Sequence, residues 1–176
     1  IFFPGEEAAG LAWKTPQDNH PDLDALSILS HILINARSGI IDRHLSQTQK
    51  IKKAQGELLR LNEGGAFLLL VAPKAGQSLE DAEKLVLSEV DRIKAGDFSE
   101  QDLRTAITYF EGNKKLNLES DKHRVGTMVD SYIKGRDWRG NVEELQRLRG
   151  LSKEDIVRVA RAYFGPDRTV VYRRQG

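Results

Sequence analysis

The sequence predicts an α+β domain in which an antiparallel-rich mixed sheet carries helices packed on one face. Strand and helix patterns are largely segregated along the chain: one strand, two helices, a β-hairpin, five helices and a last strand. The chain has 176 residues, of which 39% are hydrophobic and 30% charged. This length is enough to bury one core, so we expect residues 1–176 to form a single domain.

The first half of the chain supplies the strand, two helices and the hairpin. Leu11 and Trp13 alternate in the first strand, and a leucine and isoleucine stripe marks the first helix. The Asn-Glu-Gly-Gly turn at 62–65 joins the two hairpin strands. In chain order, these elements are expected at 10–15, 22–35, 40–49, 51–61 and 66–72.

The second half is helical until its last strand. Ser78, Ser99 and Ser152 each precede an apolar periodic run and have an acid three residues later, which is a helix-capping signal. Glycines follow several of these runs, as is typical of helix ends. The expected helices are 79–95, 100–118, 120–134, 141–149 and 156–164, and the last strand is 169–172.

The apolar periodicities also predict the residues that join the sheet to the helices. The side chains expected to point inward are Leu26, Leu29, Leu33, Phe67, Leu69, Val71, Val86, Val90 and Ile107.

The overall composition excludes several classes of function. Lys plus Arg number 27 against 26 Asp plus Glu, a net charge of +1, so there is no electrostatic reason to expect nucleic acid or an anionic membrane as partner. No apolar run is long enough to span a bilayer. With no cysteine, disulfides and thiolate chemistry are excluded, while cytoplasm and periplasm remain equally open.

The segment Ile1–Gly5 has neither an initiator Met nor the basic region of a signal peptide. We therefore expect the chain to be part of a longer protein, with any targeting signal upstream.

No catalytic or metal-binding motif is present. The histidines His20, His31, His44 and His123 show neither H-x-x-E-H nor a second His at ligand spacing. The sequence therefore predicts no catalytic residue and no metal site in this chain; His20, before Pro21, is expected to help cap a helix.

Acidic clusters and glycine turns also have structural explanations. The acids at 22, 24, 80, 81 and 83 lie where helices begin, and the helix dipole favours them there. The glycine turns lack the spacing of a phosphate-binding loop.

A short basic run, Lys50–Lys53, stands at the beginning of the first hairpin strand. These lysines either border a binding groove or keep an edge strand from aggregating, and the residues alone favour the second explanation. Under the first, Lys52 and Lys53 are the candidate substrate-binding residues.

Several segments in order resemble the pitrilysin/insulinase type (inverzincin) of zinc metallopeptidase. The resemblance covers nearly the whole chain from Gly10, with motifs that are weak singly but specific in order and spacing. The segments are 19–26 and 33–35, Ser38–Leu45, Lys50–Leu61, Ala66–Lys74, Phe98–Leu103, Leu118–Ser120, Gly135–Trp138, Leu151–Ile156 and Asp167–Gly176.

This chain looks most like the non-catalytic domain that follows the zinc-binding domain in large bacterial members. The resemblance implies that zinc and the catalytic base lie on a homologous catalytic domain, in the same polypeptide or a partner subunit, and that this domain closes over peptide substrates. It leaves the compartment unknown and is compatible with a periplasmic or exported protein.

The final domain of many family members supplies an Arg and a Tyr to the active site. Aligning the preceding Leu with Leu45 places those positions at Ser46 and Lys53, and neither residue matches. No catalytic role is therefore carried over. Family relatives without zinc are scaffolding or recognition subunits, so a structural subunit of the same fold and a stand-alone peptide-binding module remain as alternatives.

Overall fold

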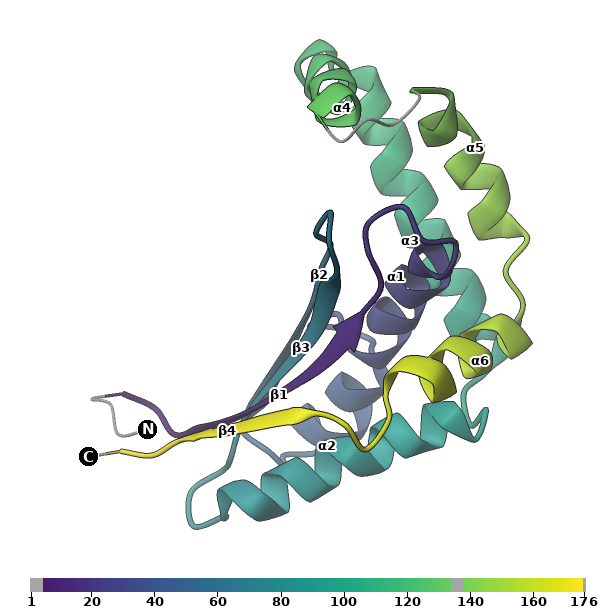
Figure 1. Cartoon of the computed structure of the whole chain (residues 1–176). Coiled ribbons are helices and arrows are strands. Elements are labelled where there is room, and N and C mark those ends of the chain that lie inside the picture. The colour runs from purple at the N-terminus through teal and green to yellow at the C-terminus, as the bar shows by residue number, and fades with distance from the viewer. Residues whose placement is uncertain (1–4, 134–137, 176) are drawn as a thin grey trace.

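The computed structural model describes residues 5–133 and 138–175. A four-stranded sheet in the order β2-β3-β1-β4 forms the centre of the molecule, and each pairing is antiparallel. The strands are β1 (Ala8–Thr15), β2 (Lys53–Leu59), β3 (Gly65–Ala72) and β4 (Thr169–Arg173). β2 is an edge strand, and the first and last described segments of the chain lie near each other beside β1 and β4 (Figure 1).

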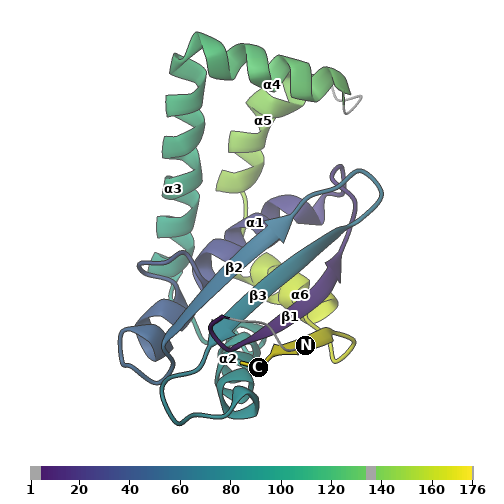
Figure 2. The same ribbon diagram turned by 90° about the vertical axis from the view of Figure 1, so that its left-hand side faces the viewer.

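Helices pack on one face of this sheet, which confirms the α+β prediction (Figure 2). The described helices are α1 (Asp22–Leu33), the short π-helix η1 (Asp42–Ser46), α2 (Leu79–Lys94), α3 (Glu100–Glu119), α4 (Asp121–Ile133), α5 (Trp138–Arg149) and α6 (Lys153–Tyr163). Of these, α1, η1, α2 and α6 lie against the sheet.

The core lies between the sheet and helices α1, α2 and α6. Trp13, Phe67 and Phe164 meet there with ring centroids 5.0–6.2 Å apart, and the Trp13 indole N–H donates to the Gly165 carbonyl at 3.1 Å. Eight of the nine predicted core residues are at most 1% exposed. The ninth, Ile107, is partly buried against the same core.

The predicted serine caps are all present. The Ser78, Ser99 and Ser152 hydroxyls each accept the backbone N–H three residues on, and Ser99 and Ser152 complete a reciprocal capping box. The sequence rule works here because a cap involves only four consecutive residues.

The second predicted helix, at 40–49, differs from the expectation. Its buried residues Ile40, Ile41 and Leu45 do point inward, but its centre is the π-turn Asp42–Ser46. The Asp42 carbonyl accepts the N–H of Gln47 at 2.8 Å, and its nearly buried carboxylate accepts the N–H of Asn35 at 2.9 Å. This second bond reaches back to the end of α1, so the wider turn is fixed by a contact outside the helix.

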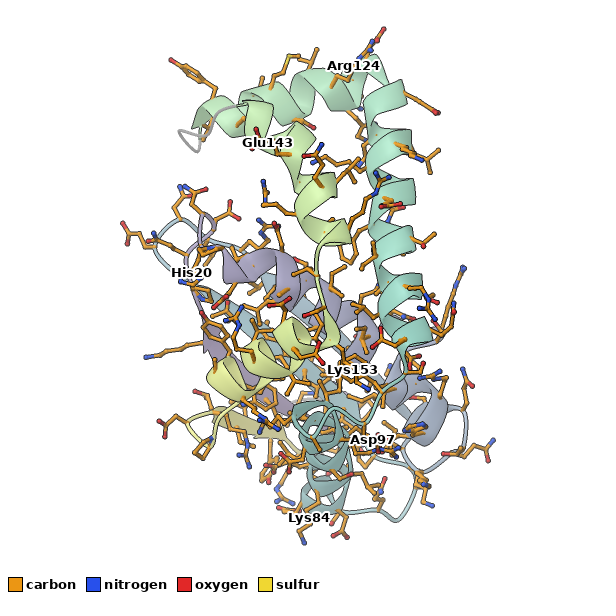
Figure 3. The ribbon with its side chains drawn as sticks, turned by 90° about the vertical axis from the view of Figure 1, so that its right-hand side faces the viewer. His20, Lys84, Asp97, Arg124, Glu143 and Lys153 are labelled. Carbon is orange, nitrogen blue, oxygen red and sulfur yellow. The ribbon has the colours of Figure 1, made fainter. Side chains whose placement is uncertain are left out.

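Helices α3, α4 and α5, in residues 100–133 and 138–149, form an arch that projects beyond the sheet (Figures 1 and 3). On α4, Val125, Met128, Val129 and Tyr132 recur at helical spacing and are 49–87% exposed. Ser131 is only 3% exposed, so the apolar stripe of this helix faces outward. None of the helices in the described parts of the chain is long and apolar enough to cross a membrane.

Candidate functional site

The two candidate lysines lie together where the edge strand β2 begins. Lys52 Nζ lies 2.7 Å from one carboxylate oxygen of Glu6, and Lys53 Nζ lies 3.0 Å from the other. The hydrogen bonds from Lys52 and then Lys53 lower the pKa of Glu6 to about 2. The lysine side chains remain 60% and 56% exposed. The site can therefore hold one carboxylate between two accessible cations.

Lys50 is the cation of the basic run that does not join this pair. Its backbone N–H donates to the Leu45 carbonyl at 2.9 Å, and its carbonyl accepts from the Gln77 side chain at 3.0 Å. These bonds hold the bend that leads into β2.

Three neighbouring hollows lead from the two lysines, past β2, to helices α1, α3 and α5. The lysine hollow, of about 310 Å³, includes Glu6, Lys53 and Arg173. The β2-edge hollow, of about 460 Å³, shares Ala54, Gln55 and Leu70 with it. The helix groove, of about 850 Å³, lies between α1, α3 and α5 and shares Ile34 and Asn35 with the β2-edge hollow. The shared lining residues make a continuous track.

The junction between the last two hollows is a rigid loop, residues 34–39. The Asn35 side-chain oxygen accepts the backbone N–H groups of residues 37, 38 and 39 at 2.8–3.3 Å. Ala36 has a φ of 66°, a left-handed conformation that costs a non-glycine residue free energy. A Cβ at Gly39 would lie 2.6 Å from Ile34 Cα, so only glycine fits. The loop is thus held in one shape.

The helix groove contains an aromatic cluster. His31 of α1 stacks on Tyr109 of α3 with centroids 4.1 Å apart and meets the edge of Phe110 at 5.7 Å. Burial lowers the pKa of His31, so the ring is neutral at pH 7. Lys114 and Glu144 form an ion pair in the same lining.

The histidines lie in four separate settings. His20 Nδ1 accepts the N–H of Asp22 at 3.2 Å, which confirms its capping role, and His44 pairs with Glu89 at 2.8 Å. His31 is stacked in the helix groove, and His123 is exposed on α4. Within residues 5–133 and 138–175, no cluster of three His, Cys, Asp or Glu side chains is placed to hold a metal. The described residues therefore do not fit a zinc site.

Of the acids where helices begin, Asp22, Asp24, Glu80 and Glu83 connect elements, and Asp81 bonds within the first turn of α2. The Asp22 carboxylate accepts from Arg158 and from the Tyr163 hydroxyl, both at 2.8 Å. Arg158 is the main cause of a lowered pKa at Asp22, and burial followed by the Asp22 bond raises the pKa of Tyr163 to about 12. These contacts tie α1 to α6, as the structural explanation of the cluster requires.

Sequence patterns alone did not identify three parts of this track. Glu6 is separated from its lysines by more than forty residues, so only the sheet brings them together. The His31–Tyr109 stack likewise joins two helices. Asn35 gave a local signal, because it stands three residues before Ser38-Gly39 and an Asn side chain readily bonds to the backbone that follows it in a turn.

Solved structures share this fold. A protease from Helicobacter pylori matches with a TM-score of 0.88 and 24% identity, over 96% of this chain and 41% of that one. A putative zinc protease from Bordetella pertussis matches with a TM-score of 0.82 and 18% identity, over 97% and 95%. The inactive peptidase domain of a putative zinc protease from Bordetella parapertussis gives 0.82 and 20%, over 98% and 92%.

Sequence comparison assigns the family. The curated Helicobacter pylori zinc protease PqqE is 24% identical over 159 residues, which is 90% of this chain and 36% of that protein. The chain thus spans about a third of that relative's length. The model of the family described as the peptidase M16 inactive domain matches residues 5–110. The chain therefore belongs to the peptidase M16 inactive-domain family.

Proposed function

We propose that residues 1–176 are a non-catalytic domain of a zinc-dependent metalloendopeptidase, which encloses and helps bind peptide substrates. Zinc and the catalytic base would lie on a homologous catalytic domain, in the same polypeptide or a partner subunit. The family assignment supports this proposal, as do relatives that are named zinc proteases.

One observation supports peptide capture above the others: Lys52 and Lys53 converge on a single carboxylate where β2 begins. Glu6 occupies the place that an acidic side chain of a peptide would take. An acidic peptide must therefore displace Glu6 before it can bind these lysines.

The edge strand β2 could bind the main chain of the same peptide. β2 pairs with β3 on one side, and the sheet ends at β2 on the other. An extended peptide can add to such an edge through main-chain hydrogen bonds, which accept many sequences. The lysines would then favour peptides with acids near one end.

Binding of labelled peptides to the 176-residue chain tests the proposal. Two blocked eight-residue peptides would be compared by fluorescence anisotropy, one with two Glu and one with two Lys at the same positions. Reversing both charges, Lys52→Glu with Lys53→Glu, should weaken the acidic peptide about fivefold to tenfold, because two exposed ion pairs are lost. The neutral change Glu6→Gln should tighten it, since the internal competitor is gone.

The control is Lys115→Glu with Lys122→Glu, which changes net charge equally on exposed lysines of the arch. It should leave binding of the acidic peptide almost unchanged. Equal losses for both peptides in the Lys52 and Lys53 variant would remove the lysines from the substrate path. If neither peptide binds, the alternative stands: a structural or scaffolding subunit of the same fold.

A further inference from the structure

We infer that the helix groove between α1, α3 and α5 is a second contact site for the same peptide, specific for an uncharged segment with an aromatic side chain. The inference rests on the proposed function, because it extends the path of a peptide already bound along β2.

Continuity of the surface is the first argument. The lysine hollow, the β2-edge hollow and the helix groove share lining residues in that order. A peptide that lies along β2 and turns away beside Gly56, at the middle of the strand, therefore meets Ile34 and Asn35 and then the groove. Ile34 can line both hollows because β2 has glycine opposite it: a Cβ at Gly56 would lie 2.3 Å from Ile34 Cγ2.

The chemistry of the groove differs from that of the lysine edge. Tyr109, Asn113 and Asn117 follow one another at intervals of four residues along α3, so their side chains share one face of the helix. The Asn113 and Asn117 carboxamides make no hydrogen bond to another described residue. Each amide offers both a donor and an acceptor, the pair of groups that a peptide main chain needs.

The aromatic stack supplies the side-chain contact. Tyr109 is 50% exposed although one of its faces lies against His31. Flat rings prefer to pack on flat rings in offset or edge arrangements. An aromatic side chain of the peptide is therefore the partner that suits the uncovered part of this stack.

Charge in the groove is nearly balanced. Lys114 is paired with Glu144, and His31 is neutral at pH 7 because burial lowers its pKa. Arg37, in the loop at the mouth, is exposed and adds one positive charge to the lining. The groove thus lacks two neighbouring lysines like Lys52 and Lys53, which together hold one carboxylate. This difference points to an uncharged segment.

The loop between the two hollows gives the site a fixed shape. The Asn35 side-chain oxygen accepts hydrogen bonds from three consecutive backbone N–H groups. Ala36, with its strained left-handed conformation, lies inside the turn that these bonds close. A rigid junction lowers the ordering cost that binding would otherwise carry.

Peptide length separates this inference from the proposed function. The short probe is the blocked acidic octapeptide described above, which reaches the lysine edge alone. The long probe has sixteen residues, in which the same acidic block is followed by an uncharged Ala-Gly segment with one Tyr. Both orders of the two blocks would be made, because a bound peptide can run parallel or antiparallel to β2. We expect the better long peptide to bind at least about tenfold more tightly than the short one, since its second contact is intramolecular.

Removing the groove contacts should abolish that gain. In Tyr109→Ala with Asn113→Ala and Asn117→Ala, the long peptide should bind no better than the short one, while the short peptide keeps its affinity. Replacing Tyr in the long peptide by Ala should have a similar effect. The matched control, Tyr132→Ala with Gln146→Ala, truncates exposed residues outside the groove and should keep the full gain. Thermal unfolding checks that each variant is folded, and Asn113→Ser with Asn117→Ser provides a milder version.

The outcomes are distinct. Equal affinity of long and short peptides, or a gain that survives the groove variant, overturns the second site and leaves the proposed function intact. Failure of both peptides to bind overturns the proposed function itself, and the groove inference with it.

Discussion

The sheet with α1, α2 and α6, here called the body, and helix α4 at the far side of the arch differ in how far their apolar side chains are exposed. In the body, Trp13, Phe67 and Phe164 are at most 1% exposed and pack against one another. In the arch, Val125 and Tyr132 are 60% and 87% exposed. Helices α3 and α5 of the arch add Leu103, Ala106 and Leu148 to the same core, whereas α4 has helical structure without a covering for its apolar stripe.

A segment can form a helix without burying its apolar side chains. α4 has its hydrogen-bonded backbone, yet its large apolar residues face outward while Ser131, a polar residue, is 3% exposed. Stability of the chain should therefore depend on the body, and truncations on the outer face of the arch should cost little.

The largest expected effect is a truncation in the body. Phe67→Ala should lower the free energy of unfolding by about 3–5 kcal/mol, because Phe67 is fully buried and a cavity would remain. Tyr132→Ala in the arch should change it by less than about 0.5 kcal/mol. Urea unfolding followed by circular dichroism measures both. A loss above about 1.5 kcal/mol for Tyr132→Ala would show that α4 is packed in solution.

Two serines give a smaller, more local comparison. Ser152→Ala should cost about 1 kcal/mol, because its hydroxyl accepts the N–H of Asp155 and takes part in a capping box of α6. Ser120, between α3 and α4, contributes its backbone carbonyl to Arg124. Ser120→Ala should therefore lie within about 0.5 kcal/mol of the parent chain. Similar losses for the two variants would mean that α4 also depends on a side-chain cap.

The smallest effect concerns pH. Asp22 has a lowered pKa in the folded body, chiefly because of Arg158, so its ion pair stabilises the fold above the ordinary pKa of an Asp. That stabilisation is lost as the pH falls through the folded pKa. Asp22→Asn should therefore be less stable than the parent at pH 7, and the difference should shrink as the pH is lowered toward 2. A difference that stays constant with pH would show that the carboxylate charge is not involved.

Local patterns predicted most of the fold, and contacts between distant segments explain what they missed. The serine caps and the strands of the hairpin follow from residues a few positions apart. The π-turn at Asp42 depends on a bond to Asn35, and the Lys52–Lys53 pair depends on Glu6. Helical periodicity predicted α4, but periodicity alone does not say whether an apolar face meets the core.

The apolar stripe of α4 has a thermodynamic consequence. Covering Val125, Met128, Val129 and Tyr132 would remove apolar surface from water, and such burial lowers the heat capacity. A peptide held at β2 by main-chain hydrogen bonds and lysine charges would bury less apolar surface. The temperature dependence of the binding enthalpy would thus report whether a binding partner covers α4 or only the edge of the sheet.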